Sequence, residues 1–284
     1  MTFSACRIAL LSPGAMGSAV AARLVAAGHS VFTSLDGRGA ASRARAEAAG
    51  MVHAPDATLA GCDIILSIVP PAQAAPLVKR LLPHLRAQAR KPLFVDANAL
   101  SPASKKALAA RLAEAECAMV DGAIIGPPPT GGPRVTTTFL SGPHAAQAMV
   151  LDVPGCSAQL LEGDVGAAAA LKMCFGGINK GVVGLASALL RAAHRHGAAE
   201  ALRAEMQRSM PDLFARYQRQ IPDMLPKAYR WVAEMEEIAA FLSPNDADGG
   251  ALFEAMAGLF AQIETDRQGN GREIAALERA VTPD

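Results

Sequence analysis

Two lysines and an asparagine stand at helical spacing within an otherwise apolar stretch of this 284-residue chain. Lys172 is flanked by residues 167–171 and 173–175, all apolar or small, and Asn179 and Lys180 follow two turns later. On an α-helix these three polar groups share one side. A lysine removed from water has an adjustable pKa, which suits a group that takes or gives a proton. The pattern leaves two interpretations open: proton transfer by Lys172, or two lysines that extend to solvent from a buried helix.

A glycine turn near the N-terminus has the spacing of a phosphate-binding turn. Residues 8–23 read IALLSPGAMGSAVAAR, a hydrophobic strand, a tight turn and a helix of small residues. In this context one glycine lets the backbone approach a pyrophosphate and another lets the helix pack closely on the strand. A turn that serves packing alone is the alternative. The cofactor contacts predicted here are Ser12, which stands where the first glycine is usual, Pro13, Gly14, Ala15, Met16 and Gly17.

The end of the second strand decides which dinucleotide is expected. An acidic residue there favours the ribose hydroxyls of NAD, and a nearby arginine favours the phosphate of NADP. Ser34 and Arg38 suit a 2′-phosphate, Arg43 lies near, and Asp36 suits a 2′-hydroxyl unless it points outward as a turn residue. The sequence favours NADP over NAD, with Ser34 and Arg38 as cofactor contacts.

Two different halves must position these groups. Short β-rich runs alternate with alanine-rich helices in the first half, which is typical of βαβ units and a mainly parallel sheet. We expect strands at 7–11, 30–34, 63–69, 93–96, 118–123 and 136–141, and helices that include 17–27 and 103–115. From about residue 165 the apolar residues recur at helical spacing only. The prediction is a doubly wound α/β Rossmann domain over residues 1–163 and an all-helical substrate and dimerisation domain over residues 164–284.

Composition excludes several classes of protein. A hydrophobic fraction of 51% excludes a disordered chain. The net charge of +1 comes without runs of like charge, so we expect a small-molecule partner rather than nucleic acid or a membrane. Five scattered cysteines show no metal-ligand spacing, so no metal is expected. The N-terminal apolar stretch lacks a basic region and leads into a glycine turn, which indicates a cytoplasmic protein.

Four blocks resemble the β-hydroxyacid dehydrogenase family, which includes 6-phosphogluconate and 3-hydroxyisobutyrate dehydrogenases. They occur in the family's order: PGAMGSAVAARL at residues 13–24, DIILSIVPP at 63–71, DANALSP at 96–102 and VDGAIIGP at 120–127. The resemblance implies that Val69 and Pro70 contact the nicotinamide side of the cofactor. It also implies that Asn98 faces the substrate and nicotinamide, and that Gly126 belongs to a substrate loop.

A fifth block, GAAAALKMCFGG at residues 166–177, is similar to the start of the family's interdomain helix, and Lys172 falls on its catalytic lysine. Residues 230–242, RWVAEMEEIAAFL, resemble the helical C-terminal domain of a poorly characterised branch of 6-phosphogluconate-dehydrogenase-like proteins. That branch fixes no substrate. The family also implies a homodimer in which the helices after residue 165 bury apolar surface against a second copy.

Two positions depart from the family pattern. Gly176 stands where many members carry an asparagine, and Asn179 lies about 10 Å further along the helix axis than Lys172. In the substrate loop Pro127 has no N–H, so one amide donor to a carboxylate is lost. These departures favour a less acidic or bulkier substrate, with Lys180 or Arg134 as anion contacts and Asn179 as a further contact.

The function expected from these residues is hydride transfer between a nicotinamide cofactor and a small hydroxy acid or related alcohol or carbonyl compound. Lys172 would serve as general acid and base. The alternatives are a dinucleotide-binding sensor or scaffold without turnover, and an enzyme that reduces imines. The predicted substrate contacts are Asn98, Gly126, Asn179 and Lys180.

Overall fold

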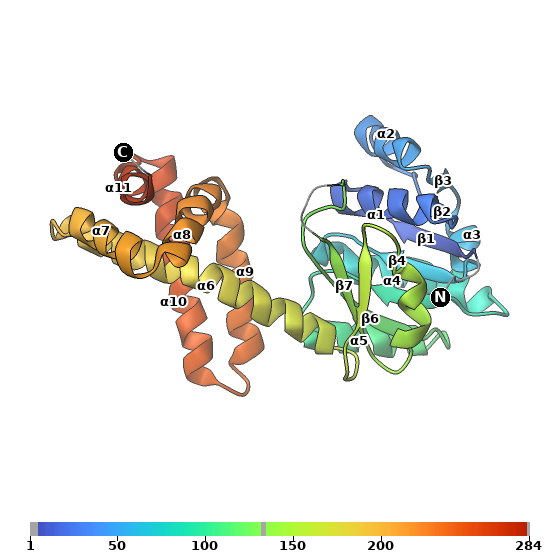
Figure 1. Cartoon of the computed structure of the whole chain (residues 1–284). Helices are drawn as coiled ribbons and strands as arrows, with labels where there is room; N and C mark the ends of the chain where they lie inside the picture. Colours follow the sequence, from blue (N-terminus) through green and yellow to red (C-terminus); the bar gives the residue numbers. More distant parts are fainter. Residues whose placement is uncertain (1–4, 132–134, 283–284) are drawn as a thin grey trace. The chain divides into compact units, whose positions relative to one another are not determined.

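A computed structural model describes residues 5–131 and 135–282. The chain forms two compact units, Met1–Lys172 and Met173–Asp284. One long helix, α6 (Ala167–Arg195), carries the chain from the first unit into the second (Figure 1). The predicted boundary after residue 163 falls just before this helix and stays a prediction.

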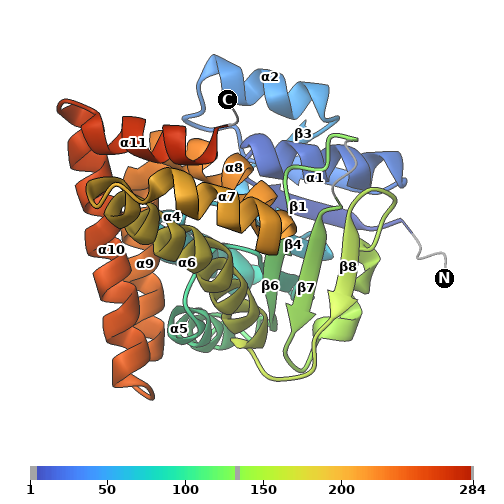
Figure 2. The same cartoon turned by 60° about the vertical axis from the view of Figure 1, so that its left-hand side comes forward.

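The first unit is built on an eight-stranded sheet in the order β3-β2-β1-β4-β5-β6-β7-β8. Neighbouring strands are parallel except for the antiparallel pair β6 and β7, which lie side by side with β8 in Figure 2. The strands are β1 (Arg7–Leu11), β2 (Ser30–Thr33), β3 (Val52–His53), β4 (Ile64–Ser67), β5 (Leu93–Asp96), β6 (Met119–Ile125), β7 (Thr137–Ser141) and β8 (Ser157–Leu160).

Helices cover both faces of this sheet because its strands are apolar on both sides. Ile8 and Leu10 of β1 belong to a core shared with helix α1, whereas Ala9 and Leu11 belong to a second core shared with α3, α4 and α5. This two-sided burial is typical of parallel strands. The helical elements of this unit are α1 (Ala15–Ala26), α2 (Ala40–Ala48), α3 (Asp56–Ala60), α4 (Pro71–Ala87), α5 (Pro102–Ala113) and the 3-10 helix η1 (Ala145–Leu151).

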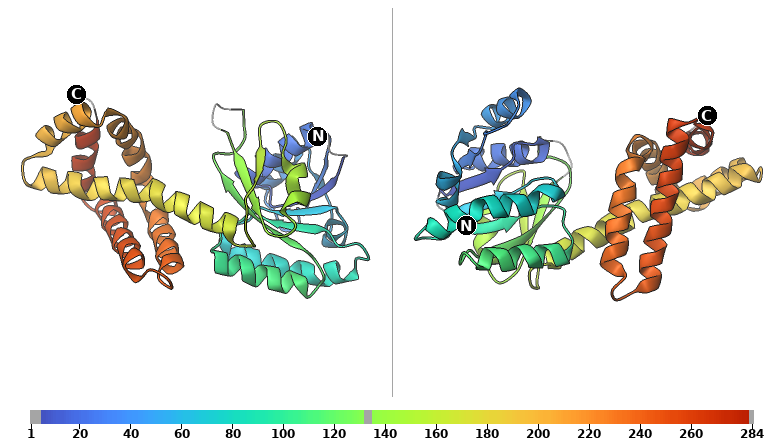
Figure 3. Two further views of the ribbon diagram at one scale, coloured as in Figure 1. Left: turned by 60° about the horizontal axis from the view of Figure 1, so that its bottom comes forward. Right: turned by 180° about the vertical axis from the view of Figure 1, so that it is seen from behind.

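The second unit is helical throughout its described residues. Phe260 lies at the centre of its core and meets Trp231 edge to face, with ring centroids 5.2 Å apart. Helices α9 and α10 run side by side (Figure 3). After α6 the elements are α7 (Ala199–Ser209), α8 (Pro211–Met224), the 3-10 helix η2 (Leu225–Lys227), α9 (Ala228–Leu242), α10 (Ala247–Gln268) and α11 (Arg272–Val281).

The predicted fold class is confirmed, since a mainly parallel α/β unit is followed by a helical one. All six predicted strands occur, with ends shifted by at most two residues. The sequence patterns do not predict β3 or β8. Strand β3 has only two residues, both exposed, and β8 is short with two exposed residues at its end, so neither gives a readable apolar period.

Helix α6 combines unusual length with apolar character. Of the helices in the described part of the chain, it alone is long and apolar enough to cross a membrane, a test that core helices of soluble proteins also pass. Its residues Val183, Ala186 and Leu190 are buried in the helical core. The helix also carries four Lys and Arg residues, Lys172, Lys180, Arg191 and Arg195, while its residues Phe175, Ile178, Leu185 and Leu189 are more than half exposed.

Candidate functional site

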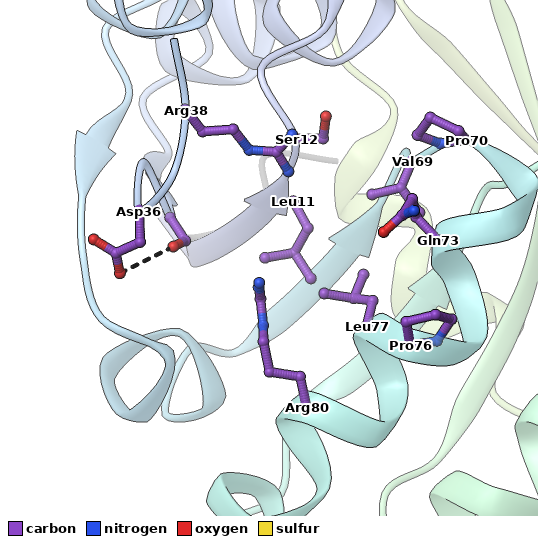
Figure 4. A pocket seen from close by; sticks show the side chains of 11 residues that line it. Leu11, Ser12, Asp36, Arg38, Val69, Pro70, Gln73, Pro76, Leu77 and Arg80 are labelled. Carbon is purple, nitrogen blue, oxygen red and sulfur yellow. Dashed lines mark hydrogen bonds between the residues drawn. The ribbon is translucent and has the colours of Figure 1, made fainter.

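A cavity of about 260 Å³ opens where the strand order reverses, beside the carboxyl ends of β1 and β4. In doubly wound sheets ligands bind at this switch point. Five of the predicted cofactor contacts line the cavity together (Figure 4): Ser12, Ser34, Arg38, Val69 and Pro70. The other lining residues are Leu11, Asp36, Gln73, Pro76, Leu77 and Arg80.

The glycine turn has the geometry that a dinucleotide needs. Gly14 is the residue before α1, no side chain caps that helix end, and a β-carbon on Gly14 would meet nothing within 4 Å. The first N–H groups of α1, from Ala15 and Met16 onward, can therefore face an anion. A β-carbon on Gly17 would collide with the carbonyl oxygen of Ser12, so only glycine allows this packing of helix on strand. These residues fit the pyrophosphate of a dinucleotide.

Ser12 adopts a conformation that favours glycine. Its φ of 86° lies in the left-handed region, where the backbone of any residue with a β-carbon is strained. Pro13, the next residue, is buried and its carbonyl oxygen accepts a 2.9 Å hydrogen bond from Arg45 Nε. The turn is thus held in place from α2.

The loop after β2 and the helix that follows it carry two arginines with different roles: Arg38 enters the cavity, and Arg43 binds the loop backbone. Arg38 lines the cavity and extends toward Ser12 (Figure 4). Arg43 instead donates to the carbonyl oxygens of Leu35, at 2.8 Å, and of Arg38, at 3.0 Å. Arg43 therefore fixes the loop that carries Arg38, and its nearness to the cavity in the sequence is explained by this structural role.

Asp36 is paired with Ser34 of the same loop and with His53 of strand β3. Ser34 Oγ donates to its carboxylate at 3.4 Å, and His53 Nε2 lies 3.6 Å from it. The His53 ring also accepts the N–H of Leu35 at 3.1 Å. This local pairing draws the Asp36 carboxylate toward the loop and β3, as expected for a turn residue.

Arg80 is a cavity residue that the sequence reasoning missed. It rises from α4 on the opposite side of the cavity from Arg38 (Figure 4), and its Nε pairs with Asp56 at 3.0 Å. Positions 73, 76, 77 and 80 share one face of the helix that follows Pro70. The sequence could therefore have predicted Arg80. Pro70 was expected to contact the cofactor, so the helix face that starts just after Pro70 had to lie beside the cofactor as well.

Asn98 is buried and holds the end of β4. Its Oδ1 accepts the N–H of Val69 at 2.6 Å, and its Nδ2 donates to Ser67 Oγ at 2.9 Å and to Asp96 Oδ2 at 2.6 Å. Both amide hydrogens are thereby engaged within the protein. A direct contact of Asn98 with substrate stays a prediction, and it would use the remaining lone pair of Oδ1.

Most of the predicted substrate loop, residues 120–127, lies in strand β6, and Gly126 follows this strand at a position where the backbone requires glycine. Gly126 has a φ of 121°, and a β-carbon there would lie 2.6 Å from the carbonyl oxygen of Val135. Thr136 Oγ1 donates to the carbonyl oxygen of Pro127, which closes the loop onto β7. Arg134, predicted as an anion contact, lies outside the described residues.

Lys172 is half-buried in the second turn of α6. The two other polar residues of its predicted face are engaged within the helical unit. Asn179 Oδ1 accepts from Arg216 at 2.7 Å and from Gln220 at 3.2 Å. Lys180 Nζ pairs with a Glu234 oxygen at 2.6 Å and lies 5.8 Å from the centre of the Trp231 ring. Substrate contacts by Asn179 and Lys180 stay predictions.

Three of the cysteine thiols are buried in the first unit: Cys62, Cys117 and Cys156. Burial raises the pKa of Cys62 and of Cys117 to about 11, so both are protonated and unsuited to nucleophilic attack. Across residues 5–131 and 135–282 no group of three or more His, Cys, Asp or Glu side chains is arranged to hold a metal ion.

The sheet order, the open glycine turn and the cavity at the switch point define a dinucleotide-binding Rossmann unit. The sequence profile of the NAD binding domain of 6-phosphogluconate dehydrogenase matches residues 7–158, more than half of the chain. The chain therefore belongs to that family. A domain of unknown function, DUF1932, matches residues 193–263 of the helical unit. No curated protein matches the chain.

Solved structures share this fold at low sequence identity. A conserved protein of unknown function, with reported similarity to 3-hydroxyacid dehydrogenases, is 24% identical, with a TM-score of 0.76 and coverage of 92% of this chain and 98% of that one. Mycobacterium tuberculosis 3-hydroxyisobutyrate dehydrogenase with L-serine is 19% identical, with a TM-score of 0.70 and coverage of 98% and 100%. An imine reductase variant from Myxococcus stipitatus, in complex with NAD+, is 19% identical, with a TM-score of 0.58 and the same coverage.

Proposed function

We propose that this protein is an NADP-dependent oxidoreductase that acts on a small hydroxy acid or a related alcohol or carbonyl compound, with Lys172 as general acid and base. The observation that carries the proposal is the cavity at the switch point, where an open glycine turn meets two arginines, Arg38 and Arg80. The family match supports NAD(P) as the ligand of this cavity.

The bound cofactor supplies or accepts the hydride. The chain's own residues bind and orient it. Gly14 and the first turn of α1 would hold the pyrophosphate. The Asn98 amide fixes the backbone at Val69, beside the position proposed for the nicotinamide, through its 2.6 Å hydrogen bond. A fixed backbone at this point restricts the nicotinamide to one position, as hydride transfer requires.

NADP is preferred to NAD in this proposal because two cations and one paired carboxylate line the adenosine end of the cavity. Arg38 and Arg80 approach it from opposite sides, and guanidinium groups bind phosphate in a two-pronged geometry. Asp36, the group that would repel a 2′-phosphate, is already drawn toward Ser34 and His53.

Lys172 would take the hydroxyl proton during oxidation and return it during reduction. Its place in the second turn of α6, half-buried and next to apolar residues in the sequence, suits a group whose charge changes during the reaction. Asn98, Gly126, Asn179 and Lys180 are the substrate contacts of the proposal. Of these, Lys180 carries the charge that an anionic substrate would meet.

The test is cofactor turnover with a panel of small hydroxy acids, alcohols and the matching aldehydes and ketones. We expect an absorbance change of NADPH with at least one compound. A sensor or scaffold would bind NADP(H), detected by fluorescence, and give no turnover with any member of the panel. Failure to bind either dinucleotide would reject both readings of the cavity.

Imine reduction is the second candidate function. It is favoured by the likeness to an imine reductase along almost the whole chain, and by Pro127, which removes an amide donor for a substrate carboxylate. The same assay with cyclic imines, and with ketones plus amines, separates the two. Turnover of imines with none of the hydroxy acids or carbonyl compounds would replace the first proposal by the second.

A cytoplasmic location is part of the proposal. The thiols Cys62, Cys117 and Cys156 are buried and Cys174 is exposed, a distribution that suits a reducing compartment. Cell fractionation with a tagged chain tests it, and recovery with membranes or outside the cell would contradict it.

A further inference from the structure

A cluster of three fully buried charges lies beneath the candidate site. Lys105 of α5 reaches Asp96 Oδ1 at 2.5 Å and Asp121 Oδ1 at 3.1 Å, and all three side chains are at most 1% exposed. The Lys105 ammonium also donates to the carbonyl oxygens of Asp96, at 2.6 Å, and Gly122, at 3.1 Å. Asp96 ends β5 and Asp121 lies across from it on β6. Such a cluster ties three elements together at the edge of the sheet that faces the cavity.

One negative charge remains after Lys105 is paired, because the cluster holds two carboxylates and one ammonium. That charge is directed to the start of α6. Asp121 Oδ2 accepts the N–H groups of Gly166 and Ala169, each at 2.9 Å. A helix N-terminus carries a partial positive charge and unpaired N–H groups, so it compensates a buried carboxylate. Asp121 therefore fixes the first turn of the helix that carries Lys172.

The other carboxylate of the cluster fixes Asn98. Asp96 Oδ2 accepts the 2.6 Å hydrogen bond from Asn98 Nδ2, and Asn98 in turn holds the N–H of Val69. One charge cluster thus sets both the turn before Lys172 and the backbone at the nicotinamide end of the cavity. Buried ion pairs add little net stability compared with apolar packing. Their exact geometry, however, restricts how the attached elements can rotate or slide.

We infer that Asp121 and Lys105 are positioning residues for the proton transfer by Lys172. Asp121 sets the position and rotation of the first turn of α6, and Lys105 holds the Asp121 and Asp96 side chains in place through its two ion pairs. This inference rests on the proposed function for its kinetic part. Its structural part, the restraint on α6, does not depend on turnover.

The test uses Asp121→Asn, which leaves Lys105 and Asp96 as a neutral one-to-one pair and weakens the acceptor for Gly166 and Ala169. We expect faster hydrogen exchange of the amides of residues 166–169. With the substrate found in the panel, we expect kcat per bound cofactor to fall by about 10- to 100-fold, the scale of a small misplacement of a reacting group. The Kd for NADPH should change by less than about twofold, since the glycine turn is untouched.

Ser141→Ala is the matched control. Ser141 Oγ accepts the N–H of Ala168 at 3.0 Å in the same turn and donates to Asp121 Oδ2 at 3.4 Å, so its loss removes only neutral contacts and leaves the Asp121 carboxylate on Gly166 and Ala169. We expect kcat to change by less than about threefold in this variant. If Asp121→Asn does not fold, Asp121→Ser replaces it, because the smaller serine side chain leaves room for water. The expected results are the same, since serine also removes the carboxylate that accepts from Gly166 and Ala169.

Two results would overturn the inference. Unchanged exchange at residues 166–169 in Asp121→Asn would show that Asp121 does not restrain α6. Faster exchange with unchanged kcat per bound cofactor would show that the restraint does not serve proton transfer. If the unmutated protein turns over no compound, the proposed function fails, while the exchange measurement still decides whether Asp121 holds the helix.

Discussion

The ammonium of Lys180 lies against Gly176, since a β-carbon placed on Gly176 would stand 3.6 Å from Lys180 Nζ. Long side chains on a helix lean toward its N-terminus, so Lys180 carries its charge back by about one turn along α6. Position 176 is where many relatives in the resembled family carry an asparagine. The Gly176 departure thus leaves room for a cation, which Glu234 holds at 2.6 Å and the Trp231 ring faces at 5.8 Å.

Lys180→Met should weaken the binding of an anionic substrate. We expect KM to rise about tenfold or more with kcat within about threefold, because a charged contact made in both the ground state and the transition state contributes roughly 1.5 kcal/mol. Steady-state kinetics with the substrate found in the panel measures this. Lys227→Met is the control, since Lys227 forms a comparable 2.6 Å pair with Asp223 on an exposed surface. A fall in kcat with unchanged KM would assign Lys180 to the chemical step instead.

Arg38→Ala and Arg80→Ala should each narrow the preference for NADP over NAD. We expect the Kd for NADP to rise about tenfold or more in each variant, while the Kd for NAD changes little, because only NADP carries the 2′-phosphate. Arg43→Ala, which removes a brace of the loop, should have a smaller effect on this ratio. Fluorescence titration gives both constants. Equal affinities of the unmutated protein for NAD and NADP would end the proposal of NADP preference.

Ser12→Gly should stabilise the dinucleotide-binding unit slightly. A left-handed conformation costs a residue with a β-carbon about 1–2 kcal/mol, and the added chain entropy of glycine offsets roughly half of this gain. We expect a rise of the order of 1–2 °C in Tm. Glu116→Gly is the matched variant, because Glu116 has a φ of 55° away from the glycine turn. A lower Tm for Ser12→Gly alone would show that the Ser12 side chain makes a stabilising contact.

Most of the sheet could be predicted from the sequence, because its central strands are apolar runs bounded by turns.

Lys105 shows what apolar patterns in the sequence do not reveal. It stands beside Lys106 in the sequence, and Lys105, Leu108 and Leu112 form the buried face of α5 while Lys106 is exposed. The spacing could have shown that Lys105 lies on the apolar side. Its partners could not be found, because Asp96 and Asp121 meet it only when β5 and β6 pair in the sheet.

The glycine turn and Arg43 show how far the candidate site itself could be predicted from the sequence. The turn was readable because its chemistry is local to a few consecutive residues. Arg43 lies near Ser34 and Arg38 in the sequence, yet it donates to two backbone oxygens of the loop. A long side chain near a site can serve the loop or the ligand. Only the folded geometry distinguishes the two.

A stripe of apolar residues on α6 predicts a homodimer. Phe175, Ile178, Leu185 and Leu189 are each more than half exposed, and Val182 completes their alternating spacing of three and four residues. That spacing is the seam by which helices pack against each other, and such contiguous exposed apolar surface is uncommon on monomers. We therefore propose that a second copy of the chain covers this stripe, as expected from the family resemblance.

Leu185→Glu combined with Leu189→Glu should convert the dimer to a monomer. Placing two carboxylates in an apolar contact opposes association because both would lose hydration. Light scattering at micromolar concentration measures the mass. Val52→Glu is the control, since Val52 is an equally exposed apolar residue on the edge strand β3 of the other unit. A monomeric unmutated protein would contradict the proposal.

Lys172→Met should lower kcat by about 10²- to 10⁴-fold, the usual contribution of a positioned acid or base, while the Kd for NADPH stays within about twofold. The reason is that Met keeps much of the side chain's length and removes only the group that takes the proton. In the oxidative direction the rate of the unmutated enzyme should rise with pH as its base loses the proton, and Lys172→Met should lose that rise.

Lys106→Met is the matched control for Lys172→Met. Lys106 is exposed, and its side chain lies close to Gly166 at the start of α6. Its loss changes the charge beside the same helix end without removing the proposed base, so kcat should stay within about threefold. A large fall in both variants would point to the net charge of the region rather than to proton transfer. Near-normal kcat in Lys172→Met would disprove the mechanism, and Lys180 would be the next group to test.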